Sequence, residues 1–434
     1  MSKIDIPTID TRRVNPFRPA VASLIGTAVE WYDYFIYGLA AATVLGPLFF
    51  PEISSTAGTM AAFATFSVGF IARPLGGIVM GHFGDRIGRK SMLVTSLMVM
   101  GVSTTGIGLL PTYDSIGVWA PILLVALRFL QGFGVGGEWS GAVLMAVEHA
   151  PASRKGLFGS FPQMGVPAGL ILANLVYLAV SGAVDDDAFI GWAWRLPFLA
   201  SALLVIVGLV MRFTIDESPA FARVINNQEQ QRIPIASVLS NHWRTVALVA
   251  GGFIGINAVA YVFMVYLLNY STTILEVDRN LMLAFSMIAS ILWLVVTPLS
   301  SVLSDRYGNR RVLAVGSVVL CVSAISLFPL VNSTKPALIV GATMFVALGM
   351  GAVYGPMAAL FSSTFPAAIR YSGTSVGYQV GSVLGGGIAP TVAGGLYAGW
   401  NSSMPITVYL TIVTISSLVC LSILMRPSRP AWSI

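Results

Sequence analysis

The sequence predicts an all-helical membrane protein, with twelve transmembrane helices arranged in two pseudo-symmetric bundles of six. Composition is the first observation, because 56% of the 434 residues are hydrophobic and only 10% are charged, against roughly a quarter charged in an average soluble domain. The second is a series of apolar runs, each near the ~20 residues that a helix needs to cross a hydrocarbon core of ~30 Å. The third is a pair of short motifs that recur half a chain apart.

Twelve spans follow from the apolar runs and from the turn and charge breaks between them. They cover residues 20–43, 58–82, 91–110, 117–146, 156–181, 192–213, 244–271, 280–303, 311–331, 336–362, 371–398 and 403–425. The longest connection, 214–243, separates an N-terminal bundle (20–213) from a C-terminal bundle (244–425), with tails at 1–19 and 426–434. The even number of spans places both tails and the central loop on one side of the membrane.

The distribution of Lys and Arg orients these spans. If the N-terminus is cytoplasmic, 19 of the 24 basic residues lie in cytoplasmic segments, as the positive-inside rule requires. The polar N-terminus, which contains prolines, lacks the charged, apolar and small-residue pattern of a cleaved signal peptide. We therefore expect a multi-pass protein of the bacterial inner membrane with both termini in the cytoplasm.

Several functional classes are disfavoured by what the spans and loops contain. Basic residues form short clusters between apolar runs rather than one continuous face, so no nucleic-acid partner is expected. The three His lie at cytoplasmic edges and both Cys lie inside apolar runs, so neither a metal site, a cofactor site nor a catalytic constellation is predicted, and the protein is expected not to be an enzyme. No phosphate-binding loop of an ATP-driven pump is present.

Two motifs recur at nearly equal offsets and indicate an internal duplication. An Asp-Arg-x-Gly motif followed by basic residues begins at Asp85 and again at Asp305, at an offset of 220 residues. A Gln-x-Gly-x-x-x-Gly motif begins at Gln163 and again at Gln379, at an offset of 216 residues. The two offsets are each about half the chain, which favours two six-helix halves over the seven-helix pattern of a receptor.

These motifs carry a resemblance to a known family. Residues 81–90 (GHFGDRIGRK) resemble the signature loop of the major facilitator superfamily, and residues 128–132 (RFLQG) resemble its fourth-helix motif. Further segments resemble the metabolite:proton symporter family within it, and they read EWYDYFIYG from Glu30, RPLGG from Arg73, GGEW from Gly136, ESPAF from Glu217 and YSGTSVGYQVG from Tyr371. The resemblance covers residues 17–425 and implies transport by alternating access, with helices 1, 4, 7 and 10 lining a central cavity.

Three ionisable residues lie near the predicted membrane midplane. An ionisable group there costs at least ~2.5 kcal/mol on insertion scales, so it needs a partner, a pathway or a proton. Glu30 and Asp33 share a face of the first span, and they cannot both ionise cheaply in a medium of low dielectric constant. We expect one of them, with Asp33 preferred because it is deeper, to carry a coupling proton, with Arg128 as its charge partner. The alternative is a static buried ion pair that joins the first and fourth spans.

Substrate contacts are predicted from a second group of residues in the spans. Arg73 precedes a proline and is expected to attract an anionic substrate, although it could equally satisfy the carbonyl that Pro74 frees in its helix. The C-terminal half has neutral polar and aromatic side chains in place of charges. The full predicted set is Arg73, Arg128, Tyr37, Gln131, Asn257, Tyr261, Tyr378 and Gln379.

Charged residues at the cytoplasmic ends of the spans are predicted to form a gate. The family resemblance implies that they hold the cytoplasmic side shut and separate when it opens, whereas simple positive-inside anchoring explains part of the basic excess. The predicted gate residues are Asp85, Arg86, Arg89, Glu138, Glu148, Arg154, Asp305 and Arg306. Glu138 lies deeper than the others, and a second proton site is the alternative for it.

From these residues and the resemblance we expect a secondary active transporter that takes up a small polar metabolite together with protons. An organic acid such as shikimate or a di- or tricarboxylate suits the two intramembrane Arg. The expected partners are this substrate, protons and the lipid bilayer, and the expected state is a monomer without a cofactor. A proton-coupled carrier of a zwitterion such as proline or betaine and an uncoupled facilitator are the alternatives.

Overall fold

The computed structural model describes residues 15–53, 55–228 and 233–425. Within these ranges the chain forms helices and no β-strand. Most of the predicted N-terminal tail, residues 1–14, and the whole predicted C-terminal tail, residues 426–434, lie outside the described residues.

Twelve helical segments of the described chain match the twelve predicted spans. They are α1 (Phe17–Thr43), α3 (Ser55–Ile87), α4 (Arg89–Leu109), α6 with α7 (Trp119–Val135 and Glu138–Glu148), α8 (Lys155–Ala183), α10 (Arg195–Phe213), α13 with α14 (Trp243–Tyr261 and Leu267–Asn269), α15 (Arg279–Tyr307), α16 (Asn309–Val331), α17 (Pro336–Thr364), α18 with α19 (Arg370–Ser382 and Ala389–Trp400) and α20 (Met404–Leu424). Their ends differ from the predicted ends by at most five residues, at the C-terminus of α3. There the helix continues through the charged residues of the Asp-Arg-x-Gly motif.

Ten of these segments are long and apolar enough to cross a membrane by length and composition alone. The other two segments do not meet this criterion, and each has a physical reason. The first, α1, contains the buried acids Glu30 and Asp33. The second, α18 with α19, is interrupted by a π-helical turn at Val383–Gly387, directly followed by a new helix with Pro390 in its first turn. Glycine and proline weaken regular helix geometry at such a point.

Glycine ends the helix in both copies of the repeated Asp-Arg-x-Gly motif. Gly88 has a φ of +117° and Gly308 has a φ of +91°, values that residues with a Cβ rarely adopt. Each glycine separates two long helices, α3 from α4 and α15 from α16. The motif therefore makes the same tight turn in both halves of the chain.

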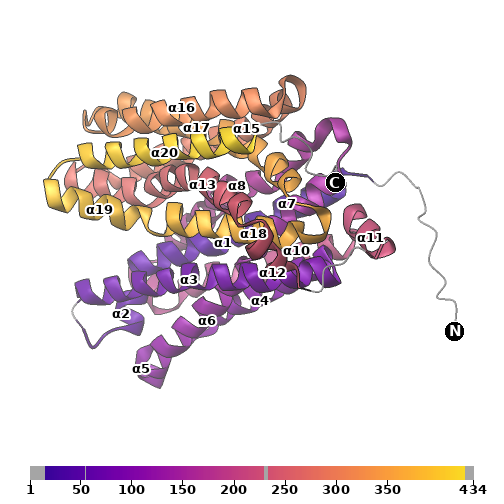
Figure 1. Cartoon of the computed structure of the whole chain (residues 1–434). Coiled ribbons are helices and arrows are strands. Elements are labelled where there is room, and N and C mark those ends of the chain that lie inside the picture. The colour runs from indigo at the N-terminus through magenta and orange to yellow at the C-terminus, as the bar shows by residue number, and fades with distance from the viewer. Residues whose placement is uncertain (1–14, 54, 229–232, 426–434) are drawn as a thin grey trace.

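The helices pack as two bundles that face each other. In the N-terminal half α1 packs on α8 and α4 packs on α10, and in the C-terminal half α17 packs on α15 and α16. The main contacts between the halves join α8 to α15 and α3 to α18. Figure 1 shows the indigo and purple helices of the first half beside the orange and yellow helices of the second.

The central connection forms two short helices rather than an extended loop. Helix α11 spans Pro219–Asn226 and α12 spans Pro234–Asn241, and both lie at the end of the molecule where α1 begins and α20 ends (Figure 1). We refer to this end as the cytoplasmic end, following the distribution of Lys and Arg. Three further short helices, α2 (Leu45–Phe49), α5 (Tyr113–Ile116) and α9 (Asp186–Ala188), lie in connections at the opposite end.

Candidate functional site

A buried ion pair joins α1 to α3 in the interior of the N-terminal bundle. Glu30 and Arg73 are each 3% exposed, and Glu30 Oε1 lies 3.6 Å from Arg73 Nη2. Arg73 Nη1 also donates to the hydroxyl of Tyr261, which belongs to α13 of the other bundle, at 3.4 Å. The guanidinium is therefore directed at an acid and at the facing bundle rather than at the carbonyl that Pro74 leaves free.

Aromatic rings surround the Arg73 guanidinium. Its Cζ lies 5.7 Å from the ring centroid of Trp31, 5.4 Å from that of Tyr34 and 5.0 Å from that of Phe70. All three rings also contact the ring of Tyr261, with centroid distances of 5.5 to 6.2 Å. Arginine is stabilised by the faces of such rings, and the effect grows when water is excluded. This aromatic cluster joins the two bundles at the level of the ion pair.

Asp33 has different surroundings from Glu30. Its Oδ2 accepts a hydrogen bond from Thr104 Oγ1 of α4 at 2.7 Å, and its Oδ1 accepts one from Ser201 Oγ of α10 at 2.6 Å. Both hydroxyl groups are buried. The two donors hold the Asp33 carboxyl in one orientation between three helices of the same bundle.

Arg128 reaches Asp33 through two intervening side chains. Gln131 Nε2 donates to Thr104 Oγ1 at 2.7 Å, and Gln131 Oε1 accepts a hydrogen bond from Arg128 Nη1. The Arg128 Cζ also lies 4.2 Å from the ring centroid of Tyr37. The sequence suggested Arg128 as the partner of the coupling acid, but the structure places Arg73 against Glu30 and separates Arg128 from Asp33 by Gln131 and Thr104.

A small cavity brings the two charged groups together. Its lining residues all come from the N-terminal bundle, on α1, α3 and α6. They are Glu30, Tyr34, Gly69, Phe70, Arg73, Arg128, Gln131, Gly132 and Val135. Because both intramembrane Arg and one acid line the same space, a small anion that entered it would meet both cations.

The remaining predicted substrate residues divide into two sets. Asn257 lies one helical turn before Tyr261 on α13, and its Nδ2 has no hydrogen-bond partner within the described residues. Tyr378 instead stacks on Trp139, with centroids 4.2 Å apart and planes 5° from parallel. Gln379 donates from Nε2 to the Gly136 carbonyl at 2.6 Å. In this conformation Tyr378 and Gln379 belong to the contact between the bundles, toward the cytoplasmic end.

The repeated Asp residues make equivalent contacts across the interface between the bundles. Asp85 of α3 accepts hydrogen bonds from the backbone N–H groups of Tyr371, at 3.1 Å, and Ser372, at 2.8 Å, at the start of α18. Asp305 of α15 accepts from the N–H groups of Gly156, at 2.7 Å, and Leu157, at 2.8 Å, at the start of α8. Each carboxylate thus lies at the positive end of a helix of the opposite bundle.

The repeated Gln residues also make equivalent contacts between the bundles. Gln163 of α8 donates from Nε2 to the Tyr354 carbonyl of α17 at 2.8 Å. Gln379 of α18 makes the corresponding bond to Gly136, between α6 and α7. Both sequence repeats therefore mark residues that join the two bundles toward the cytoplasmic end.

Ion pairs surround these backbone contacts. Glu148 lies 3.2 Å from Arg89 Nη1 of its own bundle and 2.9 Å from Arg370 Nη1 of the other. Arg89 also donates from Nη2 to the Ala367 carbonyl at 3.1 Å. Of the other predicted gate residues, Arg86, Arg154 and Arg306 are exposed.

Glu138 differs from the other predicted gate residues in its partner. It forms a buried ion pair with Arg212 of α10, within its own bundle rather than between the two bundles. No sequence pattern indicates this pairing, because Arg212 lies at the cytoplasmic end of the span 192–213, where the positive-inside rule alone accounts for a basic residue. No group of three or more metal-ligating side chains occurs in the part of the chain that the structure describes.

The fold and the site together define a class of protein. A charged, buried site in the N-terminal bundle contacts Tyr261 of the facing bundle, and contacts between the two six-helix bundles close one end. Such an arrangement is that of a carrier for small molecules, because the closed end can open only if the bundles move apart.

The chain belongs to the Major Facilitator Superfamily, whose family model matches residues 23–390. It is 42% identical over 389 residues to the inner membrane metabolite transport protein YhjE of Escherichia coli (strain K12), with 88% of each chain covered. It is 39% identical over 428 residues to the shikimate transporter of the same organism, with 95% of each covered. It is 34% identical to that organism's proline/betaine transporter, with 96% of this chain and 84% of the relative covered.

A solved structure shows the same fold. The proton:xylose symporter XylE bound to 6-bromo-6-deoxy-D-glucose matches with a TM-score of 0.79 at 17% identity, covering 93% of this chain and 94% of that one. The predicted fold class and family are therefore confirmed, and the protein is a multi-pass metabolite transporter rather than an enzyme.

Proposed function

We propose that this transporter takes up a small organic acid together with a proton, as a monomer in the bacterial inner membrane and without a cofactor. The observation that carries the proposal is the Glu30–Arg73 pair. Glu30 Oε1 lies against Arg73, whereas Glu30 Oε2 has no hydrogen-bond partner within the described residues. A buried carboxyl group with one such oxygen can take up a proton without first breaking another hydrogen bond.

Competition for Arg73 couples the proton to the substrate. In the empty carrier, ionised Glu30 neutralises Arg73. When Glu30 is protonated, Arg73 needs another anion, and a substrate carboxylate supplies it. A substrate that entered without a proton would place two anions beside one Arg, which is costly in a medium of low dielectric constant. Only the empty carrier and the fully loaded carrier then have a balanced site, so substrate and proton cross together.

The different surroundings of the two acids favour Glu30 over Asp33 as the exchange site. Both oxygens of Asp33 already accept hydrogen bonds from buried hydroxyl groups. In this proposal Asp33 positions Arg128 through Thr104 and Gln131, and Arg128 provides the second cation of the cavity. Tyr261 and Asn257 would contact the neutral part of the substrate from the facing bundle.

A zwitterionic substrate is the second candidate, and the aromatic cluster around Arg73 favours it. Trp31, Tyr34, Phe70 and Tyr261 offer ring faces, which attract quaternary ammonium groups. A betaine could place its carboxylate on Arg128 and its ammonium group among these rings. The similarity to a proline/betaine transporter supports keeping this candidate.

Uptake into proteoliposomes tests the proposal. Radiolabelled shikimate, 2-oxoglutarate, citrate, proline and glycine betaine would each be offered with the outside acidified. We expect one of the acids to accumulate, and we expect Glu30→Gln and Arg73→Gln to abolish accumulation, whereas Asp186→Asn, at an exposed residue of α9, does not. Accumulation of proline or betaine alone would support the zwitterion. Equal uptake after collapse of the pH gradient would show an uncoupled facilitator and refute the proposal.

A further inference from the structure

A second buried acid lies nearer the cytoplasmic end than Glu30. Glu138, the first residue of α7, is 0% exposed, and its Oε1 pairs with Arg212. Its other oxygen, Oε2, has no hydrogen-bond partner within the described residues. Arg212 also donates from Nη1 to the Leu93 carbonyl. The arginine is thus held at two points, while one oxygen of the acid is left over, as in Glu30.

The Glu138–Arg212 pair packs against Gly26 of α1, one helical turn before Glu30. A Cβ added to Gly26 would lie 2.2 Å from Arg212 Nη2 and 2.9 Å from Glu138 Oε1. Gly26 precedes Glu30 by four residues, so the two share a face of α1 and differ in depth by about 6 Å. Two acids, each with an unpartnered oxygen, therefore follow one another along one side of α1.

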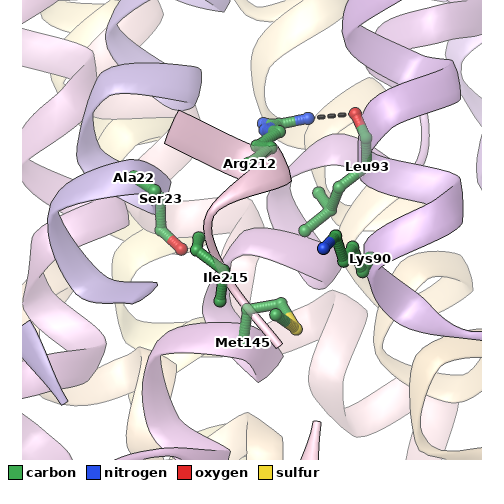
Figure 2. A pocket seen from close by; sticks show the side chains of 7 residues that line it. All are labelled: Ala22, Ser23, Lys90, Leu93, Met145, Arg212 and Ile215. Atoms are coloured by element: carbon green, nitrogen blue, oxygen red, sulfur yellow. Dashed lines mark hydrogen bonds between the residues drawn. The ribbon is translucent and has the colours of Figure 1, made fainter. Parts of the chain in front are cut away.

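Arg212, the partner of Glu138, lines a cavity that lies toward the cytoplasmic end, inside the N-terminal bundle. Its lining residues come from α1, α4, α7, α10 and the segment after α10, and they are Ala22, Ser23, Lys90, Leu93, Met145, Arg212 and Ile215. Figure 2 shows Arg212, hydrogen-bonded to the Leu93 carbonyl, on one side of the cavity, with Met145 on the opposite side and Lys90 beyond the Leu93 side chain. Lys90 is in the first turn of α4, where the chain meets the cytoplasm.

We propose that Glu138 carries the proton after Glu30 and releases it to the cytoplasm through this cavity. The inference rests on the proposed function. The proton leaves Glu30 Oε2, crosses through a bridging water molecule and binds Glu138 Oε2. Glu30 becomes a carboxylate and restores its pair with Arg73. Glu138 becomes neutral, which leaves Arg212 without a counter-charge, so loss of the proton to the cavity restores the Glu138–Arg212 pair.

The charged and titratable groups around Glu138 suit this role. Arg212 pairs with it from α10, Glu30 lies one helical turn beyond Gly26 on α1, and the Tyr371 hydroxyl of α18 donates to the carbonyl of the preceding residue, Gly137, at 2.8 Å. Arg212 is in direct contact with Glu138 and supplies its counter-charge. The route lies within one bundle, whereas the contacts of Asp85 and Asp305 lie between the bundles. The proton can therefore leave by a path that is separate from the path of the substrate.

A double variant tests this inference. Glu138→Gln with Arg212→Gln removes the acid and its counter-charge together, so no buried charge is left unpaired. Exchange of labelled for unlabelled substrate requires no net release of the proton, whereas accumulation does. With the acid that wild type accumulates as the probe, we expect exchange at the wild-type rate and accumulation reduced about tenfold or more. Asp186→Asn is the matched control and should change neither rate.

Two outcomes would overturn the inference. One is accumulation at the wild-type rate in the double variant, and the other is an equal loss of exchange and accumulation, which would show a purely structural pair. A second measurement needs no substrate. Infrared difference spectra of the purified protein, recorded across a pH titration, report the protonation of buried carboxyl groups. We expect the double variant to lose part of the protonated-carboxyl signal, and an unchanged signal would also overturn the inference. Failure of the proposed function is distinguishable, because wild type itself would then not accumulate substrate with protons.

Discussion

Replacing Asp85 by Asn would remove the charge that α3 places at the N-terminus of α18 while it keeps the shape of the side chain. In the closed structure the two carboxylate oxygens accept hydrogen bonds from Tyr371 N at 3.1 Å and Ser372 N at 2.8 Å. Asparagine retains one acceptor and turns an NH₂ group toward the second backbone N–H. The closed state loses a charge-assisted bond, while an open state, in which the bundles separate here, loses nothing.

The size of the effect follows from these contacts. Hydrogen bonds to a charged group contribute about 1.5–3 kcal/mol to stability, and a negative charge at a helix N-terminus adds about 0.3–1 kcal/mol. The one hydrogen bond that Asn still accepts is also present in the wild type, so it offsets neither loss. We therefore expect a shift of about 2–4 kcal/mol toward the open state, which corresponds to about 30- to 900-fold in the equilibrium.

Accessibility of a single cysteine measures this shift. Ser375 is a buried residue of α18 that packs near Gly81 of the other bundle, since a Cβ added to Gly81 would lie 3.4 Å from its Cβ. Ser375→Cys, with both native cysteines replaced by Ser, should react slowly with a membrane-impermeant maleimide applied from the cytoplasmic side. We expect Asp85→Asn to raise this rate by the same factor, about 30- to 900-fold, provided that open and closed states exchange rapidly.

The symmetry of the two contacts supplies the controls. Asp305→Asn should raise the alkylation rate in the same direction, because Asp305 makes the equivalent bonds to the start of α8. Asp186→Asn should leave the rate unchanged. An unchanged rate in both Asp85→Asn and Asp305→Asn, with thermal midpoints like that of the parent, would refute the role of these residues as a gate.

Three further predictions follow from the site and the interface. Gly84→Ala should prevent full closure of the cytoplasmic end and reduce the uptake rate, because the added Cβ would lie 2.0 Å from the ring of Tyr371. Gly182→Ala, at a glycine with open space around it, should leave the uptake rate unchanged. Thr104→Val should leave Asp33 one donor short and lower the thermal midpoint, because an unsatisfied buried group costs about 1–3 kcal/mol; an unchanged midpoint and uptake rate would contradict this. The initial rate of uptake should fall as the external pH rises, because the exchange site must be protonated from outside, and a flat pH profile would exclude that step.

The positions of the spans could be predicted from the sequence because the membrane constrains them strongly. A helix that crosses the hydrocarbon core needs a fixed length and an apolar surface, and the basic residues mark one side. The prediction failed by a few residues where these constraints end. At the C-terminus of α3 the helix continues past the apolar run to Ile87, since Asp85 has its partner in the other bundle and not in lipid.

The candidate site could be predicted only in part. Glu30, Asp33, Arg73 and Arg128 were found because charge is rare and costly inside a membrane. Their partners depend on the rotation and crossing of helices that are distant in sequence, which no local pattern reveals. Thr104 and Ser201 were missed for this reason, since hydroxyl residues occur throughout the spans and only the fold brings these two to Asp33.

The contacts between the two bundles are symmetric, whereas the charged site belongs to one bundle. The repeated Asp and Gln residues make equivalent contacts at the cytoplasmic end, so neither bundle can move away without breaking a copy of each. The site is not symmetric in this way, because its acids and arginines all lie in the N-terminal bundle, and the facing bundle contributes the neutral Tyr261. In the proposed mechanism, movement of the C-terminal bundle would therefore expose the substrate to one side or the other without displacing Glu30 and Arg73 relative to each other.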